Sequence, residues 1–450
     1  MSKTAIKDFT KGNITKQLLV FSAPLFLSNL LQIVYNMVDM VVVGAVCGKA
    51  GISAVSVGGD VVALLTFVGM GFGSAGQVLI ARYIGAGQRE KIGKFVGTMT
   101  AFLFIAALLI SGAGLLLRHP ILSLMNTPSE AYAWALDYSV VCMAGLVFIY
   151  GYNIVSAVLR GMGDSKHPFI FIAIAAALNV LLDILFVVIL PMGPMGAALA
   201  TVISQAVSFV SSLVFLIIKR ERFGLSVGIC DFLRFDRQML GDLVKLGTPM
   251  AIKTASIQFS KLFVNSWING YGLGVSAFAG IANKISSIAN LISAAMNTAG
   301  STMVGQNIAA GKYDRVNKIL LNLSVITLSV SAILSAVIII FPRSVYSLFT
   351  DDPEVLLIGD GFVWIAVILF IAGALRAVMN ALINGSGNYK INFVTAILDG
   401  VVMRIGLSLL FGLALGMEHY GFWLGDALAG FTPFLIGLGF YITGLWRKKT

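Results

Sequence analysis

Residues 169–190, FIFIAIAAALNVLLDILFVVIL, form an apolar run that is long enough to cross a lipid bilayer as a helix. Two polar side chains interrupt it, Asn179 and Asp183. Because they are four residues apart, they share one face of the helix. A carboxylate at that depth costs about 2.5–3.5 kcal/mol on insertion scales, and such acids are usually functional. The pair predicts half of a proton or cation site. The alternative is a hydrogen-bonded contact between packed helices.

The composition of the whole chain is that of an integral membrane protein. Of its 450 residues, 58% are hydrophobic and 11% are charged, whereas soluble domains carry about 25% charged residues. The apolar runs have helix length, which excludes a β-barrel of alternating strands. Most of the cations behind the net charge of +11 lie in short loops, so we expect no nucleic-acid partner. The three cysteines are far apart and predict no disulfide.

The sequence predicts an all-α polytopic membrane protein with twelve spans. The spans cover residues 15–43, 52–81, 92–117, 132–159, 168–190, 195–218, 240–268, 275–306, 319–341, 355–383, 391–415 and 420–445. Nearly all loop Lys and Arg residues fall on one side of these spans, and only Lys49, Arg118 and Arg343 fall on the other. By the positive-inside rule, both termini are expected in the cytoplasm.

The two halves of the chain repeat each other at an offset of 224 residues. The matched positions are Ile84, Ala86, Gly87, Lys94, Gly161, Gly163, Lys166 and Phe169 with Ile308, Ala310, Gly311, Lys318, Gly385, Gly387, Lys390 and Phe393. Six spans per half is an even number, so the repeats are parallel. We expect two pseudo-symmetric six-helix lobes, residues 1–218 and 242–450, joined by a basic cytoplasmic linker, residues 219–241. Two such lobes suggest alternating access.

Several motifs, taken together and in order, make the chain resemble the multidrug and toxic compound extrusion (MATE) family. They are Pro24, Asp39 and Gly44; Gly85-Ala86-Gly87; LRGMGDSK at 159–166; Asn179 with Asp183; Gly305-Gln306-Asn307; and Ala309-Ala310-Gly311. The resemblance implies twelve helices in two lobes and multidrug efflux driven by a proton or sodium gradient. We expect a monomer in the cytoplasmic (inner) membrane of a bacterium or archaeon. Its expected partners are small organic substrates and membrane lipids, and it needs no cofactor besides H⁺ or Na⁺.

Some prokaryotic members of this family have a cation site in the N-terminal lobe, and the resemblance carries that site to five positions here. They are Asp39, Tyr138, Asn179, Asp183 and Thr201. If the coupling ion is Na⁺, the expected ligands are Asp39, Asn179, Asp183 and Thr201. Two facing carboxylates would raise the pKa of one of them, so that the pair can hold a proton.

The second half departs from the family pattern of an acid in the seventh helix. That helix contains Lys253 and Lys261 instead, with Lys284 and Arg376 adding positive charge farther along. Asp399, Arg404 and Asp426 are candidate partners. One interpretation is an internal ion pair between either acid and a lysine. The other is a cavity that prefers anionic or zwitterionic ligands, which would contradict a simple pump for cationic drugs.

Two rival functions remain open at this stage. A lipid or lipid-linked saccharide flippase of the same superfamily is favoured by the basic residues of the second half and disfavoured by the twelve-span count. A membrane-embedded enzyme is the other rival. The sequence has no nucleophile elbow, HExxH, P-loop or GxGxxG in the right context, so we expect a transporter without catalytic residues.

Overall fold

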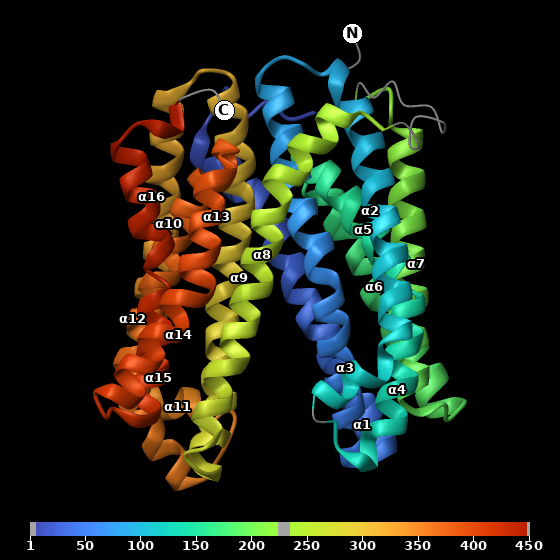
Figure 1. The fold of residues 1–450 in the computed structure, drawn as a ribbon, viewed down its shortest axis with the longest axis vertical. Helices are drawn as coiled ribbons and strands as arrows, with labels where there is room; N and C mark the ends of the chain where they lie inside the picture. The colour runs from blue at the N-terminus through green and yellow to red at the C-terminus, as the bar shows by residue number, and fades with distance from the viewer. Residues whose placement is uncertain (1–5, 126, 224–234, 448–450) are drawn as a thin grey trace. The chain divides into compact units, whose positions relative to one another are not determined.

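A computed structural model describes residues 6–125, 127–223 and 235–447, and these residues form helices and loops without a strand (Figure 1). Contacts divide the chain into two compact units. Unit 1 consists of Met1–Asp8 and Ala23–Gly247, and unit 2 of Phe9–Ser22 and Thr248–Thr450. Part of the predicted linker, residues 224–234, lies outside the described residues.

Most of unit 1 is built from seven α-helices and one π-helix. They are α1 (Ile14–Gly85), α2 (Glu90–Leu116), α3 (Arg118–Leu124), α4 (Ser129–Ala144), α5 (Leu146–Gly161), α6 (Lys166–Asp183), η1 (Ile184–Ile189) and α7 (Gly193–Ile218). The long α1 is two spans joined at Gly48, whose φ of 64° and ψ of −155° are not helical. Glycine takes this conformation without the steric cost that a side chain would bring. Helices α4 and α5 form one span bent by 49°.

Unit 2 repeats this order. Its elements are α8 (Arg237–Asn269), α9 (Leu273–Ala309), α10 (Tyr313–Ile340), α11 (Pro342–Tyr346), α12 (Pro353–Ser386), α13 (Tyr389–Ile397), η3 (Leu398–Val402), α14 (Met403–Leu409), η4 (Leu410–Ala414), α15 (Glu418–Ala429), α16 (Thr432–Ile442) and η5 (Leu445–Arg447). Residues 237–247 of α8 belong to unit 1, just as residues 14–22 of α1 belong to unit 2. Each unit therefore contains the start of the other unit's first helix.

The helices of the described chain match the predicted span count. Nine of them are long and apolar enough to cross a membrane, or ten when α4 and α5 are taken as one span. Dividing α1 at Gly48 adds an eleventh. Helix α8 is 33 residues long but less apolar, and it supplies the twelfth. The predicted all-helical polytopic fold is confirmed.

The backbone confirms the internal repeat independently of side-chain identity. Three pairs of glycines with positive φ occupy positions that differ by the same offset of 224 residues as the sequence matches. The pairs are Gly48 and Gly272, Gly87 and Gly311, and Gly163 and Gly387. Each pair ends a helix or joins two, where glycine's freedom at positive φ is needed.

The two halves also share one close approach of helices. A Cβ atom added to Gly161 would lie 2.8 Å from the backbone oxygen of Gln77, and one added to Gly385 would lie 2.8 Å from that of Ser301. Gln77 and Ser301 are themselves 224 positions apart. Glycine is required at both points because a backbone oxygen cannot move aside as a flexible side chain can.

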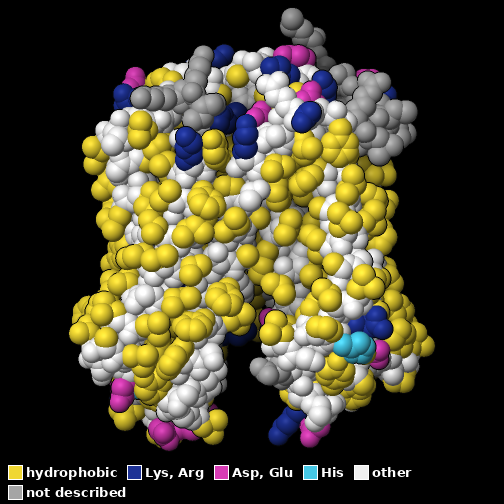
Figure 2. Space-filling model, viewed as in Figure 1, with side chains coloured by type: hydrophobic (Ala, Val, Ile, Leu, Met, Phe, Trp, Pro, Cys, Tyr) yellow, Lys and Arg dark blue, Asp and Glu magenta, His cyan; other side chains and the backbone are white. Residues whose placement is uncertain are grey.

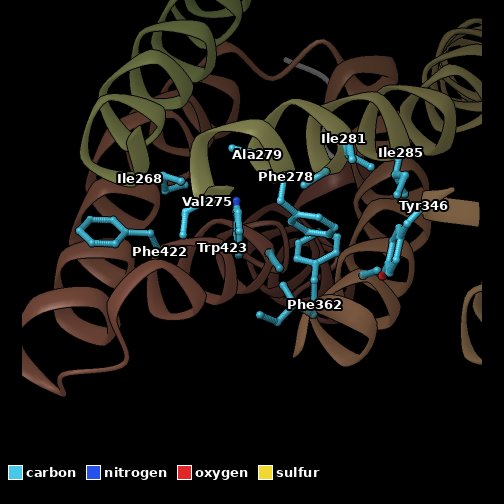
Figure 3. Close-up of a cluster of buried hydrophobic side chains, with 14 of the residues drawn as sticks. Ile268, Val275, Phe278, Ala279, Ile281, Ile285, Tyr346, Phe362, Phe422 and Trp423 are labelled. Carbon is cyan, nitrogen blue, oxygen red and sulfur yellow. The ribbon is translucent and has the colours of Figure 1, made fainter. Parts of the chain in front are cut away.

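Aromatic rings form part of a buried hydrophobic cluster in unit 2 (Figure 3). The ring of Phe278 lies edge-on to those of Tyr346, Phe362 and Trp423, at centroid distances of 5.2, 5.4 and 5.5 Å. These side chains come from α9, α11, α12 and α15, so one cluster ties four elements together. On the face that Figure 2 shows, the flanks of each unit carry mainly hydrophobic side chains, as lipid contact requires.

The N-terminal segment is held to unit 2 by hydrogen bonds. The backbone N–H of Phe9 donates to Gln306 Oε1 at 2.9 Å, and Arg315 Nε donates to the Phe9 carbonyl at 2.9 Å. Asn307 Nδ2 donates to the same carbonyl at 3.1 Å. Gln306 and Asn307 are the residues that the sequence analysis singled out near the end of the eighth span, and here they anchor the start of the chain.

In unit 1, a single carboxylate organises the start of α8. Asp236 accepts hydrogen bonds from the backbone N–H groups of Gln238 and Met239, both at 2.9 Å, as a helix N-cap does. Lys94 Nζ lies 2.7 Å from its other oxygen. The Lys94 contact, followed by the backbone N–H groups, lowers the pKa of Asp236 below its ordinary value of 3.8.

We expect the glycine pair to be intolerant of even one methyl group. Gly161→Ala and Gly385→Ala should each destabilise the protein by about 1–3 kcal/mol, because overpacking against a backbone atom forces a helix to shift. The measurement is thermal unfolding of the purified protein. Gly280→Ala is the control, since no atom lies within 4 Å of its added Cβ. Equal unfolding temperatures for Gly385→Ala and Gly280→Ala would contradict the packing argument.

The lowered pKa of Asp236 gives a pH dependence of defined sign. A depressed carboxyl pKa contributes stability above the unfolded value, and that contribution disappears as the pH falls through the folded value. We expect Asp236→Asn to remove this acid-side loss, and Lys94→Met to remove most of it. Unfolding temperatures measured from neutral to acidic pH test this. If the unfolding temperature of Asp236→Asn depended on pH as that of wild type does, protonation of the Asp236 carboxylate would not be the cause of the acid-side loss.

Candidate functional site

Two buried carboxyl groups lie side by side in unit 1. Asp39 is on the first half of α1 and is 2% exposed, and Asp183 is the last residue of α6 and is fully buried. The two carboxyls are close enough to interact directly. The π-helix η1 begins at the residue after Asp183, and π-turns in helices occur frequently at functional sites.

Asn179 and Thr201 extend this pair into a polar cluster. Asn179 lies one helical turn before Asp183 on α6, as the sequence spacing predicted. Its Nδ2 donates to Thr201 Oγ1 at 3.5 Å, and Thr201 Oγ1 donates to Asp39 Oδ2 at 3.4 Å. Both distances are at the long limit for a hydrogen bond. The cluster is therefore connected but loosely bonded.

Four oxygen atoms of this cluster are buried without a hydrogen-bond donor among the described residues. They are Asp39 Oδ1, Asn179 Oδ1 and both carboxyl oxygens of Asp183. Buried acceptors are almost always paired, and an unpaired one is costly. A proton can satisfy such a group of oxygens. So can a cation that prefers oxygen ligands, since carboxylate, amide and hydroxyl groups are all present.

Tyr138, on α4, is the fifth predicted residue, and the structure places it beside the same carboxyls. It is 6% exposed and interacts electrostatically with Asp39 and Asp183. Its ring fills the space above Gly58, where an added Cβ would lie 2.2 Å from the ring. The structure thus brings all five predicted cation-site residues together within unit 1.

Sequence analysis missed two further members of the cluster. Gln205 Nε2 donates to the Tyr35 hydroxyl at 3.5 Å. Tyr35 is four residues before Asp39, and Gln205 is four residues after Thr201, so each continues a helix face already identified. A search at helical spacing around the predicted residues would have found both. They line a small cavity with Ala175, Asn179, Thr201 and Ser204.

In unit 2, both predicted acids pair with Arg404. Arg404 Nη2 lies 3.2 Å from Asp399 Oδ1, and Arg404 Nη1 donates to Asp426 Oδ1. Arg404 is 1% exposed and Asp399 is fully buried. The pairing that the sequence suggested, of either acid with a lysine, is therefore not the one observed.

Lys253 and Arg376 each donate to an amide oxygen, and neither Lys261 nor Lys284 has a hydrogen-bond partner among the described residues. Lys253 Nζ donates to Asn380 Oδ1 at 2.5 Å, and Arg376 Nη2 donates to Asn290 Oδ1 at 2.6 Å. Lys261 lines a pocket with Arg376, Arg404 and Asp426. Lys284, in contrast, is exposed on α9 and does not line this pocket.

Comparisons with known proteins agree with the fold and the repeat. The MatE family model matches residues 24–185 and 249–418, one segment in each half. Over 442 residues the chain is 29% identical to the probable multidrug resistance protein YpnP of Bacillus subtilis, covering 98% of this chain and 97% of that protein. It is 25% identical over 448 residues to the probable multidrug resistance protein NorM of Thermotoga maritima, covering 97% and 94%.

Solved structures share the fold at lower identity. A MATE crystal structure in complex with MaD5 superposes with a TM-score of 0.89 at 23% identity, covering 99% of this chain and 100% of that one. A MOP superfamily transporter from Pyrococcus furiosus, described by the reverse polarity of its binding pocket, gives 0.88 at 23%, covering 98% of each chain.

The helical polytopic fold, together with the family match in both halves, defines a membrane transporter and not an enzyme. The chain belongs to the multidrug and toxic compound extrusion (MATE) family.

Replacing one acid of the pair should not weaken the fold. In Asp183→Asn, the new amide can donate to Asp39, whereas two ionised carboxylates can bond each other only through a proton or a cation. We expect unfolding free energy to rise by about 1 kcal/mol, the usual worth of one hydrogen bond. Thermal unfolding of purified protein is the measurement. Asp137→Asn, an exposed acid on α4, is the control and should be neutral. A large destabilisation of Asp183→Asn alone would mean that its carboxylate is a structural group.

Proposed function

We propose that this protein is a secondary antiporter that exports small amphipathic organic compounds from the cytoplasm in exchange for H⁺ or Na⁺. The observation that carries the proposal is the buried pair of Asp39 and Asp183 with its unpaired oxygens. The names of relatives such as the multidrug resistance protein of Bacillus subtilis support the substrate class. The cationic loops favour the cytoplasmic membrane, with both termini in the cytoplasm.

The carboxyl pair can couple ion and substrate because its charge depends on what it binds. Two carboxylates side by side in a low-dielectric interior repel each other and have lost hydration. A proton shared between them, or one Na⁺ bound by Asp39, Asn179, Asp183 and Thr201, relieves both costs. Coupling requires that one conformation bind the ion more tightly than the other. We infer that the two units alternate between such conformations as the site is loaded and emptied.

Tyr138 and the Tyr35–Gln205 pair have a positioning role in this proposal. Their hydroxyl and amide groups lie around the carboxyls and can exchange hydrogen bonds with them as the protonation or ion occupancy changes. Tyr138 occupies the space above Gly58, so a larger residue at 58 would displace its ring. The apolar cluster around Tyr138, which includes Val43, Val55 and Cys142, restricts water on that side of the pair.

The test is uptake of ethidium into inside-out vesicles, with pH and Na⁺ gradients imposed separately. We expect wild type to accumulate ethidium under one of the two gradients. Asp39→Asn and Asp183→Asn should each lose at least tenfold of the gradient-driven rate, because neither can be neutralised by a proton or cation in the same way. Asp137→Asn should transport as wild type does, since its side chain is exposed.

Normal gradient-driven uptake by Asp39→Asn would overturn the site. No uptake by wild type under either gradient would overturn export of organic cations. The flippase alternative would then be favoured, for which the specific observation is the set of basic side chains in unit 2.

A further inference from the structure

The interior of unit 2 contains more positive than negative charge. Four basic side chains lie there, on α8, α12 and α14, and two acids face them. The basic residues are Lys253, Lys261, Arg376 and Arg404, and the acids are Asp399 and Asp426. Arg404 bonds both acids. The other three cations have no carboxylate oxygen within 4.0 Å among the described residues. Arg404 is buried and the other three cations are half-buried. An excess of charge removed from water is costly unless a counter-ion offsets it.

Two of these cations line a pocket that could admit such a counter-ion. Lys261, from α8, and Arg376, from α12, share the lining with Asn283, Ser286 and Asn290 of α9. The pocket is open to one side, and its cavity volume is about 30 Å³, which is room for about one or two water molecules. Arg376 uses one N–H on Asn290 at 2.6 Å, which fixes the guanidinium and leaves its other donors. No described residue accepts a hydrogen bond from Lys261.

A second pocket, with polar and apolar residues in its lining, adjoins the basic one. The two share Lys261, Asn283, Ser286, Leu369 and Asp426 in their linings. Beyond these, the second pocket is lined by Val264, Ile268, Ala282, Phe362 and Trp423, with Asn265 as a further polar residue. Phe362 and Trp423 belong to the aromatic cluster in Figure 3, and their ring centroids are 5.3 Å apart.

We propose that unit 2 contains a binding site for an amphipathic anion. The carboxylate or phosphate group of the ligand lies between Lys261 and Arg376, and its apolar chain lies against Phe362 and Trp423. An arginine held by an amide presents N–H groups in the geometry that carboxylate and phosphate oxygens accept. The carboxylate of Asp426 also lines the pocket, but it is bonded by Arg404. The site deepens the proposed function by naming a substrate class, and rests on that function only for the step from binding to export.

Direct binding to the full-length protein, purified in a neutral maltoside detergent, tests the site without any gradient. Isothermal titration would compare dodecanoate and dodecyl phosphate with dodecyltrimethylammonium. We expect both anions to bind and the cation to bind at least tenfold more weakly. Lys261→Gln and Arg376→Gln should each weaken anion binding about tenfold or more, as expected for loss of a charge-assisted hydrogen bond. Equal affinity of these variants and wild type would overturn the proposal.

Two matched variants distinguish loss of a charge at the site from loss of a charge elsewhere on the protein. Lys284→Gln removes the same charge from an exposed position on the neighbouring α9 and should bind within twofold of wild type. Lys261→Arg keeps the charge, should retain binding, and shows that loss in Lys261→Gln is not misfolding. Comparable loss in Lys284→Gln would reduce the effect to non-specific electrostatics and overturn the site.

The apolar part of the site has its own test. Trp423→Ala should weaken dodecanoate about tenfold. Inorganic phosphate, which has no chain, should bind wild type far more weakly than dodecyl phosphate does. Equal affinity for the two phosphates would overturn the amphipathic assignment.

Binding measured in phosphatidylcholine nanodiscs, with and without phosphatidic acid, distinguishes a bilayer lipid from a soluble amphiphile as the source of the anion. Competition by phosphatidic acid against dodecanoate would support the site with a bilayer lipid as its occupant. Unchanged dodecanoate binding would support it with a soluble amphiphile. Lost anion binding alongside intact ethidium export would overturn this site alone. Intact anion binding without any export would overturn only the antiport proposal.

Discussion

A charged side chain inside a bilayer must be paired, hydrogen-bonded or given a ligand, and this constraint explains where the polar residues of this transporter lie. On the face that Figure 2 shows, the flanks of both units carry mainly hydrophobic side chains. Asp39, Asp183, Asp399 and Arg404 are buried inside the units. Arg404 satisfies this constraint by bonding two acids, Asp399 and Asp426. Asp39 and Asp183 meet it only in part, because buried oxygens of both lack donors. The proposed ion binding depends on these buried oxygens, which no described residue satisfies.

The two repeats place their polar groups on corresponding helices, but the charged groups are acidic in unit 1 and mainly basic in unit 2. In unit 1 they lie on α1, α4, α6 and α7, and in unit 2 on α8, α12, α14 and α15. The positions themselves do not correspond, since 224 residues after Asp183 stands Leu407. Backbone features such as the positive-φ glycines are thus shared between the halves, whereas the charge is not. The common framework fixes helix geometry and leaves each interior free to take a different ligand.

Much of this arrangement could be predicted because a membrane leaves so few alternatives. Hydropathy located the spans, and the family resemblance named five residues that the structure brings together in unit 1. The orientation that the loop charges predict stays a prediction. The break at Gly48 lies between the predicted spans 15–43 and 52–81, but a single non-helical glycine stands there in place of a loop. The pairing of Arg404 with Asp399 and Asp426 escaped prediction because it depends on how α14 faces α15. Lys284 was grouped with the other cations of the second half, but its side chain is exposed and does not line the pocket of Lys261 and Arg376.

The attachment of the N-terminal segment to unit 2 bears on how the protein is made. Phe9 is bonded to Gln306, which is 297 residues later in the chain. Synthesis at about 5–20 residues per second separates the two by roughly 15–60 s. During that time the first helix is already entering the membrane while its partner does not yet exist. Nor can the chain be cut between its halves to give two self-contained bodies, because each unit needs a segment encoded in the other half. Assembly is therefore completed only when nearly the whole chain has emerged from the ribosome.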